Sequence, residues 1–188
     1  MNAGLDALDD AGLVALHRAG RRSAFATLMA RHKQPLYRLI VAQTRDADDA
    51  LDLLQETFVA AHGALARFDP DRSLRAWLAR IAINKCRDWQ RRRRVRHFLA
   101  RVLPIEAGER VADPGADAEA QAIDRDELAQ ALEAIGRLPA ALREPLLLCT
   151  VDELSHVEAG EALGITAKAV ETRIRRARAA LSGQSATS

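Results

Sequence analysis

"SHVEAGEALGITAKAVETRIRRARAAL", residues 155–181, contains the start and end signals of two consecutive helices. Ser155 and Glu158 have the spacing of a capping box, which predicts that a helix begins there. Gly164 tolerates a positive φ and is expected to end that helix. After a tight turn, Thr166 can cap the next helix. The segment therefore predicts two helices joined by a short, glycine-containing turn.

The second of these helices has two chemically different faces. Val170, Ile174, Ala177 and Leu181 recur at spacings of three and four, so they are expected to face a core. The opposite face carries Lys168, Glu171, Thr172, Arg175 and Arg176. A short helix, a glycine turn and a helix with a cationic outer face are typical of a helix-turn-helix, whose second helix enters the major groove of DNA. Arginines that merely solvate an exposed helix are the alternative.

A glycine inside the first of these helices supports a close crossing. Gly160 occupies a mid-helix position, where glycine costs about 1 kcal/mol relative to alanine. This cost is understandable if the second helix crosses the first so closely at Gly160 that no side chain fits between them. We therefore expect close packing at Gly160.

The composition favours helices throughout the chain. Aromatic residues make up only 4% of the 188 residues, and aliphatic residues supply the rest of the apolar share. A chain of this length allows two small domains.

Cys86 and Cys149 stand far apart without a zinc or disulfide pattern, so we expect no metal and no cofactor. No run of eighteen apolar residues occurs, which predicts a cytoplasmic protein without membrane insertion.

The charges are segregated along the chain although the net charge is only +2. Residues 85–101 contain eight basic residues and one acid, whereas residues 102–130 contain eight acids and two basic residues.

Helical periodicity fades over 97–122, where proline and glycine appear, so this segment is predicted to be a flexible linker. The expected organisation is all-α, with a first domain over 1–96 and a second, helix-turn-helix domain of four helices over 123–188.

The linker is long enough to separate two DNA contacts. Its roughly 26 residues reach about 85 Å when fully stretched, at about 3.3 Å per residue. This exceeds two turns of duplex DNA at about 34 Å per turn. The two domains are therefore expected to be able to bind far apart.

Three amphipathic helices are predicted in the first domain. Apolar residues between 25 and 40 indicate one helix, or two helices kinked at Pro35. "FDPDRS", residues 68–73, is a turn signal. A third helix then begins near Leu74, and its apolar face continues to Cys86 or Trp89.

The second of these three helices carries acids beside an apolar stripe. Asp46 is expected to cap it. The predicted buried stripe is Ala47, Leu51, Leu54, Phe58, Ala61 and Leu65, and the opposite face carries Asp48, Asp49, Asp52, Gln55 and Glu56. Leu53 lies among the acids, so we expect it to be exposed, as part of a surface that binds a basic partner. The alternative is an ordinary acidic helix start that matches the helix dipole.

"NKCRDWQRRRR", residues 84–94, places an arginine run beside amide and aromatic side chains. The side chains expected to project are Asn84, Lys85, Arg87, Asp88 and Arg91. With aromatic surface from Trp77 and Trp89, such a face suits single-stranded nucleic acid, because bases stack on rings while guanidinium groups hold phosphates. A cation-rich helix end and a basic targeting run are the alternatives.

Three motifs, taken in their order along the chain, resemble those of a known protein family. "DADDALDLLQETF", then "FDPDRSLRAWLARIAINKCRDWQRRRR", then the segment from "LPAALREP" to "RRARAAL" closely resembles extracytoplasmic-function (ECF) sigma factors of bacterial RNA polymerase, over residues 20–182. The resemblance implies a non-enzymatic subunit that binds the polymerase core, through its β′ and β subunits, and directs promoter-specific transcription initiation. It also implies promoter DNA and an inhibitory anti-sigma factor as partners, and a role in stress responses.

The resemblance also assigns roles to residues. The residues implied to bind core polymerase are Asp49, Asp52, Leu53, Gln55 and Glu56. Those implied to bind the minus-ten promoter element are Phe68, Asp69, Arg72, Ser73, Trp77, Asn84, Lys85, Arg87, Asp88 and Arg91. Those implied to bind the minus-35 element are Lys168, Glu171, Thr172, Arg175 and Arg176. Glu171 departs from the family, many of whose members have a cation there; a carboxylate repels phosphates but can accept from cytosine N4.

Two other functions fit the same helices. A helix-turn-helix repressor or activator would bind operator DNA without polymerase, and a helical adaptor would bind only protein. Both lack the expected dependence on core polymerase.

Overall fold

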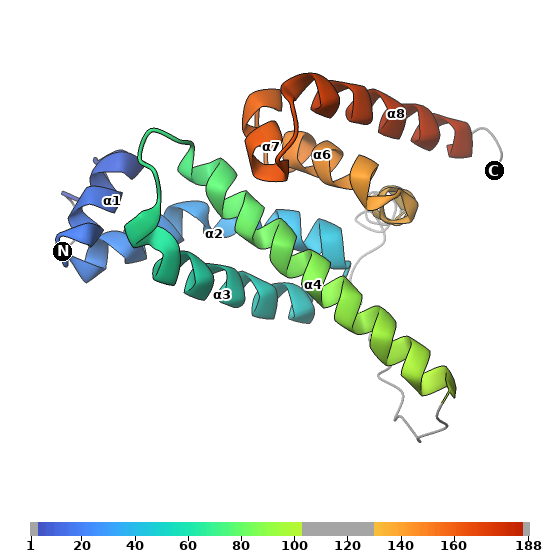
Figure 1. Cartoon of the computed structure of the whole chain (residues 1–188), viewed down its shortest axis with the longest axis horizontal. Helices are drawn as coiled ribbons and strands as arrows, with labels where there is room; N and C mark the ends of the chain where they lie inside the picture. The colour runs from blue at the N-terminus through green and yellow to red at the C-terminus, as the bar shows by residue number, and fades with distance from the viewer. Residues whose placement is uncertain (1–3, 103–129, 186–188) are drawn as a thin grey trace, which may run out of the picture.

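The computed structural model describes residues 4–102 and 130–185, which are helical with short connections and contain no strand. Figure 1 shows two groups of helices, one from each half of the chain. The predicted all-α class is confirmed. The low aromatic content and the aliphatic stripes explain it, because such stripes bury well between helices.

The first half forms a bundle of four helices: α1 (Asp10–Arg18), α2 (Arg22–Thr44), α3 (Ala47–Ala64) and α4 (Leu74–Val102). A short 3-10 turn, Leu65–Arg67, leads from α3 into the loop before α4. α2, α3 and α4 pack against one another, and α1 packs on α2. Pro35 lies inside α2, so of the two predicted alternatives the single helix is the one observed.

The second half contains a helical segment over 130–137, then α6 (Ala140–Thr150), α7 (His156–Leu163) and α8 (Ala167–Ser185). α6, α7 and α8 pack against one another. α4 continues to Val102, so its last residues lie in the segment for which the sequence predicts a linker. Residues 103–122 of that predicted linker lie outside the described residues.

The buried face of α3 differs from the predicted one. Leu53 is 2% exposed, whereas Leu51 is 51% exposed, so both expectations for these leucines were wrong. The buried residues are Ala50, Leu53, Leu54, Thr57 and Ala61. The reason is that α3 is covered by two neighbours, α2 and α4, and the second neighbour buries the side that carries Leu53.

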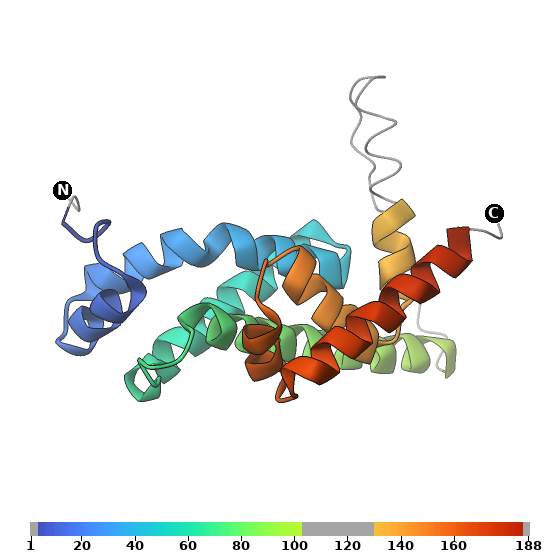
Figure 2. The same cartoon turned by 90° about the horizontal axis from the view of Figure 1, so that it is seen from above.

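The two helical groups lie against each other. α7 packs on α4, and α6 contacts α2, so the apolar cores of the two halves join. Figure 2 shows α7 next to α4, and in Figure 1 α8 lies on the side of α6 and α7 that faces away from α4. The domains are thus in contact here, not held far apart as the reach of the linker allows.

Candidate polymerase and nucleic-acid interfaces

Local capping signals build the helix-turn-helix as predicted. Ser155 Oγ accepts from the backbone N–H of Glu158 at 3.2 Å, and a Glu158 carboxylate oxygen accepts from the backbone N–H of Ser155 at 3.0 Å. Gly164 ends α7 with φ 69°. Thr166 Oγ1 then accepts from the backbone N–H of Ala169 at 3.1 Å. These bonds satisfy some of the backbone donors that the start of a helix leaves free.

The close approach expected at Gly160 is present. A Cβ at this position would lie 2.7 Å from the carbonyl oxygen of Ile165 and 3.4 Å from the nitrogen of Ala167. The contact is therefore with the turn and the first residue of α8, not with the body of the helix. Only glycine lets the two helices meet in this way.

The outer face of α8 is open to solvent. Val170, Ile174 and Ala177 are buried on the other side of the helix, as predicted. The exposed side chains are Lys168, Glu171, Arg175 and Arg176. Thr172 is half-buried, and its hydroxyl donates to the carbonyl of Lys168 at 2.9 Å. Four of the five predicted duplex-binding residues thus share one accessible surface.

Glu171 has a partner on its own helix. Lys168 Nζ donates to the Glu171 carboxylate at 2.8 Å, and this hydrogen bond, together with the lysine charge, lowers the pKa of Glu171. The carboxylate is therefore ionised at neutral pH and partly neutralised by its neighbour.

The basic cluster of α4 is divided between surface and core. Asn84, Asp88 and Arg91 are exposed, and Arg91 pairs with Asp88 at 2.6 Å. Lys85 reaches Glu56 of α3 at 3.1 Å. Trp89 is only 7% exposed, so its ring is not available for stacking on a base.

The other aromatic residues predicted near the minus-ten element pack on each other. The rings of Phe68 and Trp77 have centroids 5.0 Å apart, with Phe68 buried and Trp77 half-buried. The exposed part of the 68–73 loop is instead polar. Asp69 and Arg72 are exposed, and their charged groups lie 3.6 Å apart.

The second domain contacts part of this predicted minus-ten surface. Arg87 donates to both carboxylate oxygens of Glu144 on α6, at 2.8 and 2.5 Å. Ser73 Oγ donates to Glu158 on α7 at 2.8 Å. Arg75, which was not among the predicted site residues, pairs with the fully buried Asp152 at 3.4 Å. Ser73, Arg75 and Arg87 therefore each make a polar contact that joins the start or middle of α4 to the second domain.

Burial shifts several titratable groups at this junction. Burial raises the pKa of Asp152 to about 6, although the charge of Arg75 opposes the shift. The hydrogen bond to Glu144 raises the pKa of Arg87. Cys86 lies on α4, is 2% exposed, and burial raises the pKa of its thiol to about 12, with the charge of Glu144 adding to the shift. That thiol stays protonated at neutral pH, so it is a poor nucleophile.

The partners on the second domain were not predicted from the sequence. Arg143 and Glu144 interrupt an otherwise apolar α6, and both are buried. A charged pair inside an apolar stripe is a signal that could have indicated a polar interface.

Two exposed apolar residues, Leu51 and Val59, lie beside the predicted polymerase-binding residues of α3. Asp52 and Gln55 are exposed, while Asp49 and Glu56 are half-buried. Leu51 and Val59, the latter 68% exposed, line a groove of about 790 Å³ between α2 and α3, together with Phe25 and Met29. The exposed apolar residues beside the acids are therefore Leu51 and Val59, not Leu53.

The described residues contain neither a cluster of side chains suited to a metal ion nor a helix long and apolar enough to cross a membrane.

Comparisons with known proteins agree with this geometry. Residues 28–96 match the family model of Sigma-70 region 2, and residues 128–181 match Sigma-70, region 4. The chain is similar to RNA polymerase sigma factor NccH of Alcaligenes xylosoxydans xylosoxydans, with 44% identity over 86% of this chain and 87% of the relative. It is also similar to RNA polymerase sigma factor CnrH of Cupriavidus metallidurans, with 42% identity over 90% of this chain and 91% of the relative.

Solved structures give the same result. The structure of CnrH in complex with the cytosolic domain of CnrY covers 95% of this chain and 97% of its own, with 36% identity and a TM-score of 0.71. A complex of the sigma factor RpoE with the anti-sigma factor NepR from Bartonella quintana has 22% identity and a TM-score of 0.64, which supports the fold.

Helical halves that match regions 2 and 4 define a sigma factor, a DNA-recognition subunit. The chain belongs to the extracytoplasmic-function sigma factors of bacterial RNA polymerase, which bind the core enzyme and direct promoter-specific transcription initiation.

Proposed function

We propose that the three surfaces divide the work of promoter recognition. The acidic face of α3 binds the core polymerase, and its residues are Asp49, Asp52, Gln55 and Glu56, with Leu51 and Val59 as apolar additions. The 68–73 loop and the exposed side of α4 bind the separated strand of the minus-ten element. α8 reads the minus-35 element in the major groove. The observation that carries the proposal is the open, basic outer face of α8 on a correctly capped helix-turn-helix.

DNA melting in this proposal uses binding energy and no catalytic group of this chain. Unstacking a base costs a few kcal/mol. Phosphate contacts from Lys85, Arg87 and Arg91 can offset that cost, because guanidinium and ammonium groups bind phosphates with charge-assisted hydrogen bonds. Since Phe68 and Trp89 are buried, the flipped base is expected to meet polar side chains such as Asn84 rather than an exposed ring.

An anti-sigma factor is the proposed regulatory partner. The structural relatives CnrH and RpoE are seen in complexes with the cytosolic domain of CnrY and with NepR. The apolar groove between α2 and α3 offers a surface that such a partner can cover. We accordingly propose that the protein acts in the cytoplasm, where polymerase is available.

Run-off transcription with purified core polymerase on genomic fragments tests the function. New transcripts are expected only when the protein is added to the core enzyme. Tight binding of the isolated protein to a palindromic duplex, without new transcripts, would instead favour the repressor or activator. Absence of both would favour the protein-only adaptor.

Asn84→Ala tests the role of α4. The side chain is exposed, and among the described residues its amide oxygen accepts only a long bond of 3.4 Å from Arg87, so the substitution should not disturb the fold. Open-complex formation, followed by permanganate reactivity of thymines, is expected to fall, while association with core polymerase is unchanged. Gln34→Ala on the exposed side of α2 is the matched control. Equal loss of association and opening would contradict the assignment.

A further inference from the structure

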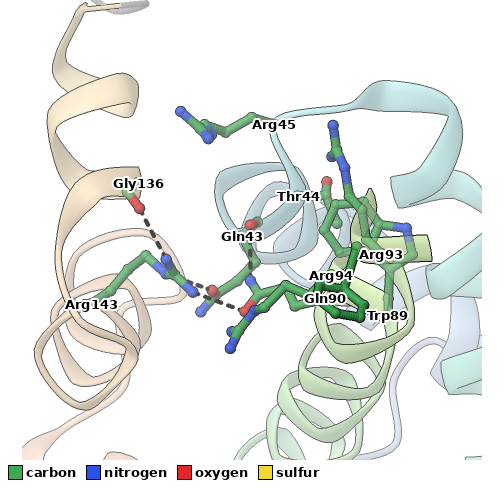
Figure 3. A pocket seen from close by; sticks show the side chains of 10 residues that line it. Gln43, Thr44, Arg45, Trp89, Gln90, Arg93, Arg94, Gly136 and Arg143 are labelled. Carbon is green, nitrogen blue, oxygen red and sulfur yellow. Dashed lines mark hydrogen bonds between the residues drawn. The ribbon is translucent and has the colours of Figure 1, made fainter. Parts of the chain in front are cut away.

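A pocket between the two domains lies outside the surfaces assigned above. Its volume is about 750 Å³, and it is bounded by the end of α2, the second half of α4 and the segment around α6. Among the residues that the structure describes, four arginines line it, namely Arg45, Arg93, Arg94 and Arg143, and no carboxylate does. Figure 3 shows Arg45 and Arg143 reaching into it from different helices. This pocket therefore concentrates positive charge in a concave, partly enclosed space.

The charge of Arg143 is not neutralised by its hydrogen bonds. This side chain is 8% exposed and donates to three neutral oxygens: Gln43 Oε1 at 3.0 Å, Gly136 O at 3.1 Å and Gln90 Oε1 at 3.2 Å. Burial lowers the pKa of Arg143, and the charges of Arg45 and Arg94 act in the same direction, against an opposite effect of Glu144. The guanidinium is thus held in place by neutral groups while other cations repel it.

Two further donors of the pocket make no hydrogen bond within the described residues. They are Gln43 Nε2 and Trp89 Nε1, both buried, and Gln43 is 6% exposed. A buried donor without an acceptor is unfavourable, so each of these two groups calls for a partner such as a bound water, an ion or a ligand group. Both residues line the same pocket as the arginines.

Arg45 occupies a conformation that glycine usually takes. It ends α2 with φ 58°, in the left-handed region, where a side chain is disfavoured. Its guanidinium lies against Gly136 of the second domain, where a Cβ would come within 3.0 Å of Cζ. Strain of this kind is concentrated at functional positions, and here it places a guanidinium at the pocket.

We propose that this pocket binds a small phosphorylated ligand of nucleotide size. Guanidinium groups bind phosphoryl oxygens in a bidentate manner, and four of them match a ligand with two or more phosphoryl groups. The volume falls within the range of about 300–1,000 Å³ that is typical of small-molecule sites. Since its walls come from both domains, the bound ligand holds the domains together.

Calorimetric titration of the full chain with pyrophosphate and with ADP, at about 0.15 M salt, tests the proposal without polymerase or promoter. Both ligands are expected to bind, and tighter binding of ADP would show that the base contributes. Arg45→Gly should weaken binding at least about tenfold. The fold should persist, because glycine relieves the left-handed backbone.

Two control variants separate the pocket from general effects. Glu153→Gly relieves another non-glycine residue with a left-handed backbone, φ 51°, which does not line the pocket. Arg92→Ala removes a cation from the same arginine run, but Arg92 lines the groove between α3 and α4 instead. Both controls should bind pyrophosphate and ADP as the parent chain does. Both ligands should raise the thermal midpoint of the parent chain by more than that of Arg45→Gly.

Three outcomes would overturn the proposal. Equal weakening in Arg92→Ala would indicate a diffuse effect of positive charge. Binding that depends on Arg45 for a single-stranded oligonucleotide, but not for pyrophosphate or ADP, would assign the pocket to DNA. Failure of the full chain to bind either ligand would also overturn it.

Discussion

α4 and α8 carry the two arginine-rich faces of the protein, and they differ in what surrounds them. The outer face of α8 is exposed, and its Lys168–Glu171 pair stays within the helix. On α4, by contrast, Arg87 is held by Glu144 of the second domain, and Ser73 just before the helix is held by Glu158. In this arrangement the proposed duplex-reading face is free, whereas the proposed strand-binding face is partly occupied by the chain itself.

This difference indicates that duplex binding at α8 can come before strand binding at α4. A duplex can approach α8 without any change in the contacts described here. Full use of α4 requires that Arg87 and Ser73 leave their partners on the second domain, so the two domains have to move apart. Strand binding is therefore expected to depend on the strength of the junction between the domains.

Arg87→Ala is expected to have the largest effect on the contact between the two domains. It leaves the Glu144 carboxylate buried without its partner, which costs about 3 kcal/mol of the free energy of unfolding, less than for a fully buried pair because Arg87 is half exposed. Denaturant unfolding measures the loss. Arg91→Ala is the matched control, since its pair with Asp88 is exposed on both sides and should change stability by less than about 0.5 kcal/mol. Similar losses in the two variants would contradict a junction at Arg87.

Asp152 is expected to make the free energy of unfolding depend on pH at the junction between the two domains. Its pKa of about 6 in the folded protein lies above the ordinary value of 3.8, so folding favours the protonated form. The stabilising contribution is present below about pH 4 and is lost as the pH rises through about 6. Asp152→Asn should remove this loss. As the pH rises from 4 to 7, the free energy of unfolding of the variant minus that of the parent chain should therefore increase by on the order of 2 kcal/mol. A constant difference across this range would exclude a buried titrating carboxylate.

Gly160→Ala tests the α8 side. The added Cβ would meet the Ile165 carbonyl at 2.7 Å, and backbone has to shift because no flexible side chain is involved. We expect a loss of about 1–2 kcal/mol in stability and weaker binding to minus-35 duplex, measured by unfolding and by fluorescence anisotropy. Gly63→Ala is the control, because nothing lies within 4 Å of a Cβ there and alanine favours the helix. Unchanged duplex binding by Gly160→Ala would separate the α7–α8 contact from recognition.

Arg175→Ala should have the smallest effect on the fold. Its side chain is exposed on α8, so the thermal midpoint should not change, while the slope of log affinity for duplex against log salt falls by about 1. Glu171→Gln should act in the opposite direction and strengthen duplex binding, since a carboxylate near the phosphates is removed. An unchanged salt slope in Arg175→Ala would place this arginine outside the DNA contact.

The parts of the fold that could be predicted from the sequence are those that depend on local signals. The caps at Ser155, Gly164 and Thr166 act within one helical turn, so the positions of α7 and α8 were predictable from nearby residues. The burial of Leu53 was not, because one apolar stripe cannot indicate that α3 has neighbours on two sides. The pair of Arg87 and Glu144 joins residues far apart in the chain, and only the packing of the domains brings them together. The assigned DNA and polymerase contacts remain predictions.

Cys86 offers a natural reporter of this domain movement. Its thiol is shielded and protonated while Glu144 and Arg143 lie nearby, so alkylating reagents should react slowly with the closed form. In a Cys149→Ser background, the rate of alkylation would follow the opening of the molecule in real time, without any attached dye. Adding core polymerase to such a reaction would reveal whether the enzyme itself pulls the halves apart.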